Sequence, residues 1–105
     1  MIIEYNKSLR SLNTFGVNCI AENFINIKKD EDIKESIQYL KNTKNNHFIL
    51  GGGSNILLTK NITGVVLHNQ INGIKIIDED NTSVIVKVGS GVIWNDFVNW
   101  SIKNQ

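Results

Sequence analysis

The sequence has no proline, a single cysteine and almost no net charge. One cysteine, Cys19, excludes an internal disulfide. The 11 Lys and Arg residues against 10 Asp and Glu give a net charge of +1, so no strong field favours nucleic acid or an anionic membrane as a partner. The missing proline, with abundant Ile, Asn and Lys, is interpreted as compositional drift and carries no functional meaning.

Long apolar runs are also missing. No stretch is long enough to span a bilayer and no apolar signal segment opens the chain, so we expect a cytoplasmic protein without a membrane partner. The 105 residues correspond to one small domain or to part of a larger protein. A chain of this size can bury a core between one layer of helices and one sheet.

The most distinctive stretch runs from Phe48 to Leu58, where three glycines separate two apolar segments. Because glycine has no Cβ, the backbone N–H groups of residues 51–53 can turn together toward one anion, most often a phosphate. Ser54 and Asn55 can add side-chain hydrogen bonds to it. The alternative is a tight turn in which these two side chains bond only their own backbone.

This glycine loop differs from the two better-known phosphate loops. Ile56 stands where the Gly-x-Gly-x-x-Gly fingerprint needs its third glycine, and Lys60 is followed by Asn61 rather than Ser or Thr. Both of those motifs also need a helix directly after the loop, whereas residues 56–59 are short and are followed by an expected turn. We therefore expect loop amides, not a helix N-terminus, to hold the phosphate.

Residues up to about Asn69 are expected to combine strands and one helix. The expected elements are an irregular arm over 2–12, turns over 13–17 and 60–64, strands over 20–27, 47–50 and 65–68, and a helix over 33–41. Ile33, Ile37 and Leu40 fall on one face of that helix. The order strand, helix, strand predicts a right-handed crossover and a parallel pair.

Residues after about Asn69 are expected to be mainly β, so we place a subdomain seam there, between 1–69 and 70–105. Strands over 73–77 and 83–88 are joined by the polar cluster 78–82, which is interpreted as a solvated hairpin turn rather than a cation site. A helix follows, in which Ser90 is the expected cap and one of its two tryptophans, Trp94 or Trp100, the core anchor.

The histidines and the cysteine are interpreted as structural. His47 and His68 lie at strand ends without a second ligand nearby in the sequence, which argues against a metal site or a general base. Cys19 has no basic neighbour that would make its thiol reactive.

The chain stops within its last expected helix, and its last strands have no obvious partners. The sequence therefore predicts the front part of a larger protein, which on its own would associate with itself through an unpaired sheet edge. The rival hypothesis is a complete nucleotide- or phosphate-binding module of 105 residues without catalysis.

Four motifs together resemble the UDP-N-acetylenolpyruvoylglucosamine reductases, flavin enzymes of bacterial peptidoglycan and cell wall synthesis. The motifs are residues 13–16, 50–58, 64–66 and 88–94, and the resemblance runs from about Leu12 to the last residue. It implies part of an α+β FAD-binding domain like that of the vanillyl-alcohol-oxidase flavoproteins. Another flavin oxidase or dehydrogenase of that fold is the alternative.

The resemblance also implies roles for particular residues. It places the FAD pyrophosphate against Gly51, Gly52, Gly53, Ser54 and Asn55, puts Ile56 and Leu57 near the cofactor, and puts Asn13 and Thr14 beside the loop, either contacting FAD or bracing the loop. The implied reaction uses NADPH to reduce the enolpyruvyl group of a UDP-sugar. The serine, arginine and glutamate that act on this substrate in the family lie downstream of the matched stretch, so the chain is expected to hold no catalytic residue and no metal.

Overall fold

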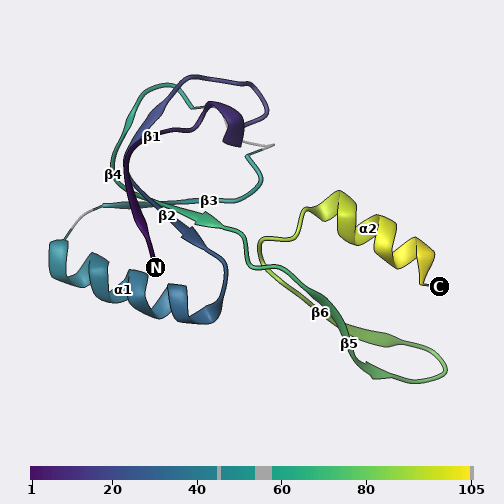
Figure 1. The fold of residues 1–105 in the computed structure, drawn as a ribbon. Helices are drawn as coiled ribbons and strands as arrows, with labels where there is room; N and C mark the ends of the chain where they lie inside the picture. The colour runs from purple at the N-terminus through teal and green to yellow at the C-terminus, as the bar shows by residue number, and fades with distance from the viewer. Residues whose placement is uncertain (45, 54–57, 105) are drawn as a thin grey trace.

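The computed structural model describes residues 1–44, 46–53 and 58–104 (Figure 1). These residues form, in order, β1 (Ile3–Ser8), the short 3-10 helix η1 (Arg10–Leu12), β2 (Ile20–Ile27), α1 (Asp30–Thr43), β3 (His47–Leu50), β4 (Ile62–Asn69), β5 (Ile74–Glu79), β6 (Val84–Val88) and α2 (Trp94–Lys103). The α+β class is confirmed. The division of the chain at residue 69 into two subdomains stays a prediction.

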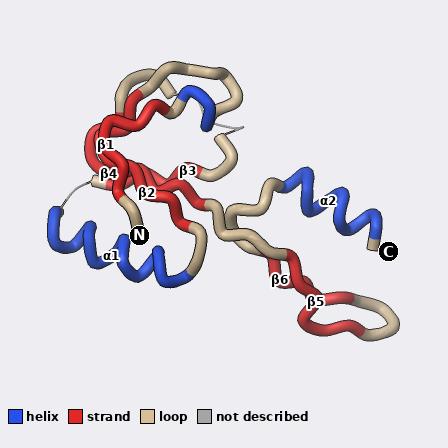
Figure 2. The backbone as a smooth tube through the Cα atoms, viewed as in Figure 1, coloured by secondary structure: helices blue, strands red, loops and turns tan. Residues whose placement is uncertain are grey.

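The first four strands form one mixed sheet in the order β1-β2-β4-β3 (Figure 2). β4 pairs in parallel with both β2 and β3, and β1 pairs with β2 in the antiparallel direction. The predicted strand–helix–strand unit β2–α1–β3 is therefore parallel. Its two strands are not direct neighbours, however, because β4 comes later in the chain and is inserted between them.

Two stretches differ from the expected local structure. Residues 2–12, predicted as an arm, contain strand β1 and helix η1. Residues 60–64, predicted as a turn, contain the start of β4. Gly64, which indicated the turn, lies inside the strand with a φ of 87°. Glycine is needed there because a Cβ would stand 2.4 Å from the Asn46 carbonyl oxygen. A shift in the register between β2 and β4 accommodates it.

Each face of this sheet is covered by an apolar cluster. Successive residues of a strand point to opposite faces, so neighbouring residues belong to different clusters. Phe24 belongs to one apolar cluster with Leu9 and Leu50, whereas its neighbour Ile25 belongs to another with Val65. Tyr39 and Leu40 of α1 pack against the second cluster, and Leu12 and Val17, from the segment that follows β1, pack against the first.

Helix α1 packs only part of its predicted apolar face against the sheet: Leu40 contacts the second cluster, but Ile33 and Ile37 do not face it. Ile33 and Ile37 are 39% and 48% exposed, while Asp32 and Ser36 are buried. Asp32 gives the reason, since its Oδ2 accepts a hydrogen bond of 3.0 Å from the backbone N–H of Lys28. This bond holds the first turn against the end of β2, and Ile33, about 100° further round the helix, then points outward.

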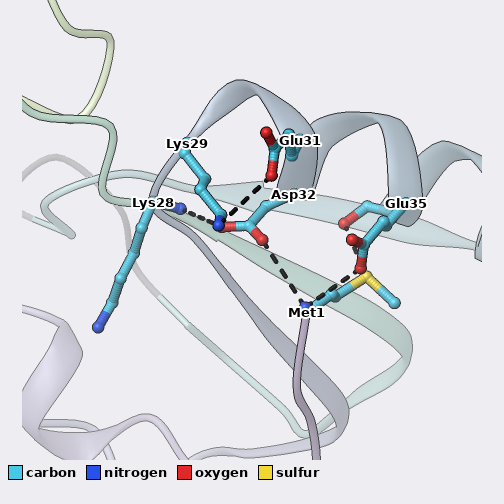
Figure 3. A network of polar contacts seen from close by, with 7 residues as sticks. Met1, Lys28, Lys29, Glu31, Asp32 and Glu35 are labelled. Carbon is cyan, nitrogen blue, oxygen red and sulfur yellow. Dashed lines mark hydrogen bonds and ion pairs between the residues drawn. The ribbon is translucent and has the colours of Figure 1, made fainter.

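A polar network surrounds Asp32 (Figure 3). The N-terminal ammonium of Met1 lies 3.9 Å from Asp32 Oδ1 and 3.1 Å from Glu35 Oε2. The hydrogen bond from the Lys28 backbone is the main cause of a lowered Asp32 pKa, with the Lys29 backbone and the positive charge of the N-terminus acting in the same direction and burial opposing them. The carboxylate is thus stabilised in its charged form.

We expect the Asp32→Asn variant to have a lower free energy of unfolding than the native chain at pH 7. Because folding lowers the pKa of Asp32, its carboxylate contributes to the free energy of unfolding at pH values above its ordinary pKa of 3.8. This contribution is lost as the pH falls through the pKa of the folded state. Thermal unfolding at pH 7 and at pH 3 measures this. Asp30→Asn is the matched control, since it removes the same charge from the same turn at an exposed position. Equal losses in both variants at pH 7 would contradict the assignment.

The second sheet is a hairpin that projects from the first (Figure 1). β5 and β6 pair in the antiparallel direction, which confirms the predicted hairpin, and the Asp80 carboxylate closes its turn by accepting the N–H groups of Thr82 and Ser83 at 2.8 and 2.7 Å. Its base continues as a paired ribbon, because Gly89 N–H donates to the Gly73 carbonyl and Gly91 N–H to the Ile71 carbonyl, both at 2.8 Å. The radius of gyration, 16.3 Å, exceeds the roughly 13 Å of a compact domain of this length, so the chain is elongated.

Helix α2 is present as predicted but is packed differently. Its N-cap is Ile93 without a side-chain cap, so the predicted Ser90 cap is wrong; the Ser90 hydroxyl instead lies 2.8 Å from Asn69 Nδ2. The predicted core anchor is also wrong, because α2 buries no residue and Trp94 is 74% exposed. Its aromatic rings contact one another, and no helix among the described residues is long and apolar enough to cross a membrane.

Candidate functional site

The glycine loop begins where β3 ends. Leu50, the last residue of β3, is buried and stands opposite His68 in β4. The carboxyl ends of the parallel strands β2, β4 and β3 therefore meet at one edge of the sheet, beside Gly51. This edge is where open sheets with parallel strands bind their ligands.

Gly53 is locked against the segment that follows β1. Its carbonyl accepts a hydrogen bond of 3.1 Å from the Thr14 N–H. Its φ is 73°, and a Cβ there would lie 2.0 Å from the Leu12 carbonyl oxygen and 2.9 Å from Asn13 Cα. Only glycine fits this position without a shift of the backbone.

Asn13 gives that supporting segment its shape. Its Nδ2 donates to the carbonyls of Leu9 and Val17 at 2.7 and 3.2 Å, and its Oδ1 accepts from the Val17 N–H at 3.0 Å. The predicted turn is confirmed by the 3.2 Å bond from the Gly16 N–H to the Asn13 carbonyl. The side chain of Asn13 is buried and satisfied by its own segment, which is the geometry of a brace; its predicted place beside FAD stays a prediction.

Gly51 and Gly52, in contrast, are open. Nothing lies within 4 Å of a Cβ built on either residue. Among the described residues, no turn or loop hydrogen bond involves the N–H groups of 51–53. Glycines with open space around them let an anion approach the backbone closely. The predicted site residues Ser54, Asn55, Ile56 and Leu57 lie outside the described residues.

His68 is buried beside the loop. Its Nδ1 lies 2.9 Å from Asn26 Oδ1, and its ring centroid lies 5.7 Å from that of Phe24. Burial lowers the pKa of His68 and the charge of Lys7 adds to this, while the nearby polar backbone of Gly51 opposes it. The interpretation of His68 as a structural residue, made from the sequence, does not connect it with the loop. The available signal was a polar side chain at the carboxyl end of a strand that neighbours the loop's own strand.

The other singled-out side chains lie away from this edge. His47 is exposed at the start of β3, and the buried thiol of Cys19 lies 2.8 Å from the Lys60 carbonyl. Across the ranges 1–44, 46–53 and 58–104, no group of three or more His, Cys, Asp or Glu side chains could hold a metal ion.

The chain is similar over nearly its whole length to curated reductases. It is 45% identical over 105 residues to the UDP-N-acetylenolpyruvoylglucosamine reductase of Flavobacterium johnsoniae, 35% over 103 residues to that of Bacteroides fragilis, and 33% over 101 residues to that of Pseudomonas fluorescens. These matches cover 100%, 98% and 96% of this chain. They cover 31%, 31% and 30% of the three relatives, so the chain spans about a third of their length.

A family comparison covers most of the chain. Residues 21–105, which include all but the first residue of β2, the glycine loop and everything after it, match the family described as FAD binding domain. The similarity to the reductases that the four motifs indicated is confirmed by the curated relatives. The chain therefore belongs to the FAD binding domain family.

Proposed function

We propose that this chain is the N-terminal part of a UDP-N-acetylenolpyruvoylglucosamine reductase and that its glycine loop holds the pyrophosphate of FAD. The observation that carries the proposal is the 45% identity over all 105 residues to a protein of that name. The open glycines at the carboxyl edge of the sheet support it, because a ligand can approach their backbone closely where an open sheet binds ligands.

In this proposal each described residue of the loop has a distinct task. Gly51 and Gly52 present N–H groups and no side chain, so the pyrophosphate can approach the backbone closely. Gly53, held by Thr14, fixes the far end of the described loop, and Asn13 keeps the bracing segment in shape. Ser54 and Asn55 would add side-chain donors to the same phosphates. The flavin, when bound, supplies the hydride transfer from NADPH to the substrate double bond.

The rest of the reaction belongs to residues beyond the matched motifs. We propose that the groups which bind the UDP-sugar and protonate it lie in the remaining two thirds of a protein as long as the relatives, and that this protein acts in the cytoplasm. The described chain would then supply one wall of the cofactor site. Taken alone, the chain would expose apolar residues of β5 and β6 and would associate with itself through an unpaired edge of that two-stranded sheet.

The test uses the full protein that contains these residues. We expect it to purify with yellow FAD and to oxidise NADPH only when UDP-N-acetylglucosamine enolpyruvate is added. UDP-N-acetylglucosamine, which lacks the enolpyruvyl group, is the control substrate and should give the background rate. The 105-residue chain alone should bind FAD weakly or not at all and oxidise no NADPH in response to substrate.

Two results would count against the proposal. A flavin-loaded full protein that passes electrons to oxygen from an alcohol or hydroxy acid, and ignores the UDP-sugar, would make it an oxidase of the same fold. A full protein that binds nucleotides but no flavin would favour the binding module without catalysis.

A further inference from the structure

The side chains of Asn69 and Ser90 form a pair of hydrogen bonds that joins the first sheet to the exit of the hairpin. Asn69 is the last residue of β4, and its Nδ2 donates to Ser90 Oγ at 2.8 Å, while the Ser90 hydroxyl donates to Asn69 Oδ1 at 3.2 Å. Asn69 Oδ1 also accepts a bond of 3.2 Å from the Ile71 N–H, so the backbone that follows Asn69 fixes the orientation of its amide. We call this pair the Asn69–Ser90 clasp.

The turn that carries Ser90 lies directly on the backbone of residues 70–72. A Cβ on Gly89 would stand 2.3 Å from the Ile71 carbonyl oxygen, and a Cβ on Gly91 would stand 2.5 Å from the Ile71 nitrogen. Any other residue at either position would therefore push the turn away from the end of β4. Ser90, between the two glycines, is the one residue of this turn that has a side chain, and that side chain bonds the end of β4.

The clasp lies at the sheet edge that borders the glycine loop. Asn69 directly follows His68, which stands opposite Leu50, the last residue before the loop. On its other side, Asn69 stands opposite Ile27 of β2. β5 begins shortly after Asn69 and α2 shortly after Ser90, so the clasp joins the chain where it enters the hairpin to the chain where it leaves it.

A cofactor as long as FAD needs more than the loop. Sites for such ligands bury most of the ligand's surface and commonly lie between two structural units. The match to the FAD binding domain family covers residues 21–105, so it includes the hairpin and α2 as well as the loop. Where two units share one site, the apparent affinity falls with the fraction of molecules in which the units are correctly placed. A contact that keeps this fraction high strengthens binding without touching the ligand.

We propose that Asn69 and Ser90 are positioning residues for the cofactor site: their clasp holds the hairpin and α2 at the angle to the glycine loop at which both units contact one FAD molecule. This inference rests on the proposed function. It predicts that the two residues act as one unit on the affinity for FAD, although neither belongs to the loop.

The experiment measures FAD binding to the flavin-free full protein by fluorescence quenching. We expect Ser90→Ala to weaken binding about threefold and Asn69→Ala about fivefold, because exposed hydrogen bonds contribute modestly and N69A also loses the bond to Ile71. The double variant should be no weaker than N69A, since the clasp is already broken. Ser90→Thr keeps the hydroxyl and should bind FAD as the native protein does. Ser101→Ala is the matched control and should have no effect, because this hydroxyl of α2 bonds within the helix, to the Phe97 carbonyl at 2.9 Å.

Each other outcome has a definite meaning. Native FAD affinity in both S90A and N69A overturns the role of the clasp and leaves the proposed function intact. The same holds if the double variant loses the product of the two single losses, or if S90T or S101A binds as weakly as S90A. If N69A does not fold, S90A and S90T decide, since Ser90 is exposed. A native full protein that binds no FAD overturns the proposed function and the role of the clasp together.

Discussion

The Gly53→Ala variant is expected to lose roughly 4 kcal/mol of unfolding free energy and nearly all affinity for FAD. Two effects combine at this position. Alanine at a φ of 73° costs roughly 1–2 kcal/mol, and its Cβ would overlap the backbone of Leu12 and Asn13, which cannot move without disturbing the bonds of Asn13. Because domains are stable by only about 5–15 kcal/mol, the loss is large.

Gly16→Ala is the control that separates these two effects. Gly16 also has a positive φ, 63°, but nothing lies within 4 Å of its Cβ position. It should therefore lose only the conformational part, roughly 1–2 kcal/mol. Chemical denaturation of both variants and flavin fluorescence of the full protein provide the measurements. Equal losses for G16A and G53A would show that the close contact with Leu12 and Asn13 has no energetic importance.

The second large effect is expected for Asn13→Ala, with a loss of about 3 kcal/mol. The substitution leaves the Val17 N–H without a partner and removes one of the two hydrogen bonds that the Leu9 and Val17 carbonyls each accept, in a segment where Asn13 is 8% exposed. An unpaired buried N–H costs about 1–3 kcal/mol and each of the two other lost bonds roughly 0.5–1.5 kcal/mol, and partial access to water reduces their sum. The variant should also weaken FAD binding, because the loosened segment carries Thr14, the partner of Gly53.

Asn18→Ala is the matched control for Asn13. Asn18 lies in the same segment but is exposed, and its Oδ1 accepts one bond of 3.2 Å from the Ser8 hydroxyl. It should change the unfolding free energy by less than about 0.5 kcal/mol. If N13A proves as mild as N18A, or if N13A weakens stability while FAD binds with full affinity, the bracing role of the 9–17 segment is wrong.

Local patterns predicted those parts of the fold whose determinants lie close together in the sequence. β2 has the predicted bounds, and the hairpin of β5 and β6 forms around the predicted polar turn, because β-branched runs and turn residues act over short distances. The placement of β4 between β2 and β3 depends on chain that follows both, so strand order could not be predicted from the strand–helix–strand unit. The face of α1 includes polar contacts of Asp32 with Lys28 and with the N-terminus, which apolar periodicity does not contain.

The candidate site also has one part that the sequence predicts, the glycine loop, and one part that it does not, the residues that support the loop. The three glycines identified the loop by composition, because close approach to an anion needs residues without side chains. Its support could not be predicted, since Thr14 and Gly53 are brought together by the fold of the sheet, and His68 stands opposite Leu50, the residue before the loop, through the pairing of β3 with β4. Asn13 and Thr14 came from the family resemblance, which placed them near the loop without stating what they bond.

The ribbon between the two sheets also determines how force passes through the molecule. Two segments, 71–73 and 89–91, run side by side there and are joined by the bonds Gly89–Gly73 and Gly91–Ile71. Rotation of the hairpin about one segment would have to break both hydrogen bonds. The two paired segments therefore resist twisting of the hairpin relative to the first sheet. A load applied to α2 should therefore be transmitted to the ends of β2 and β4, the sheet edge that borders the glycine loop.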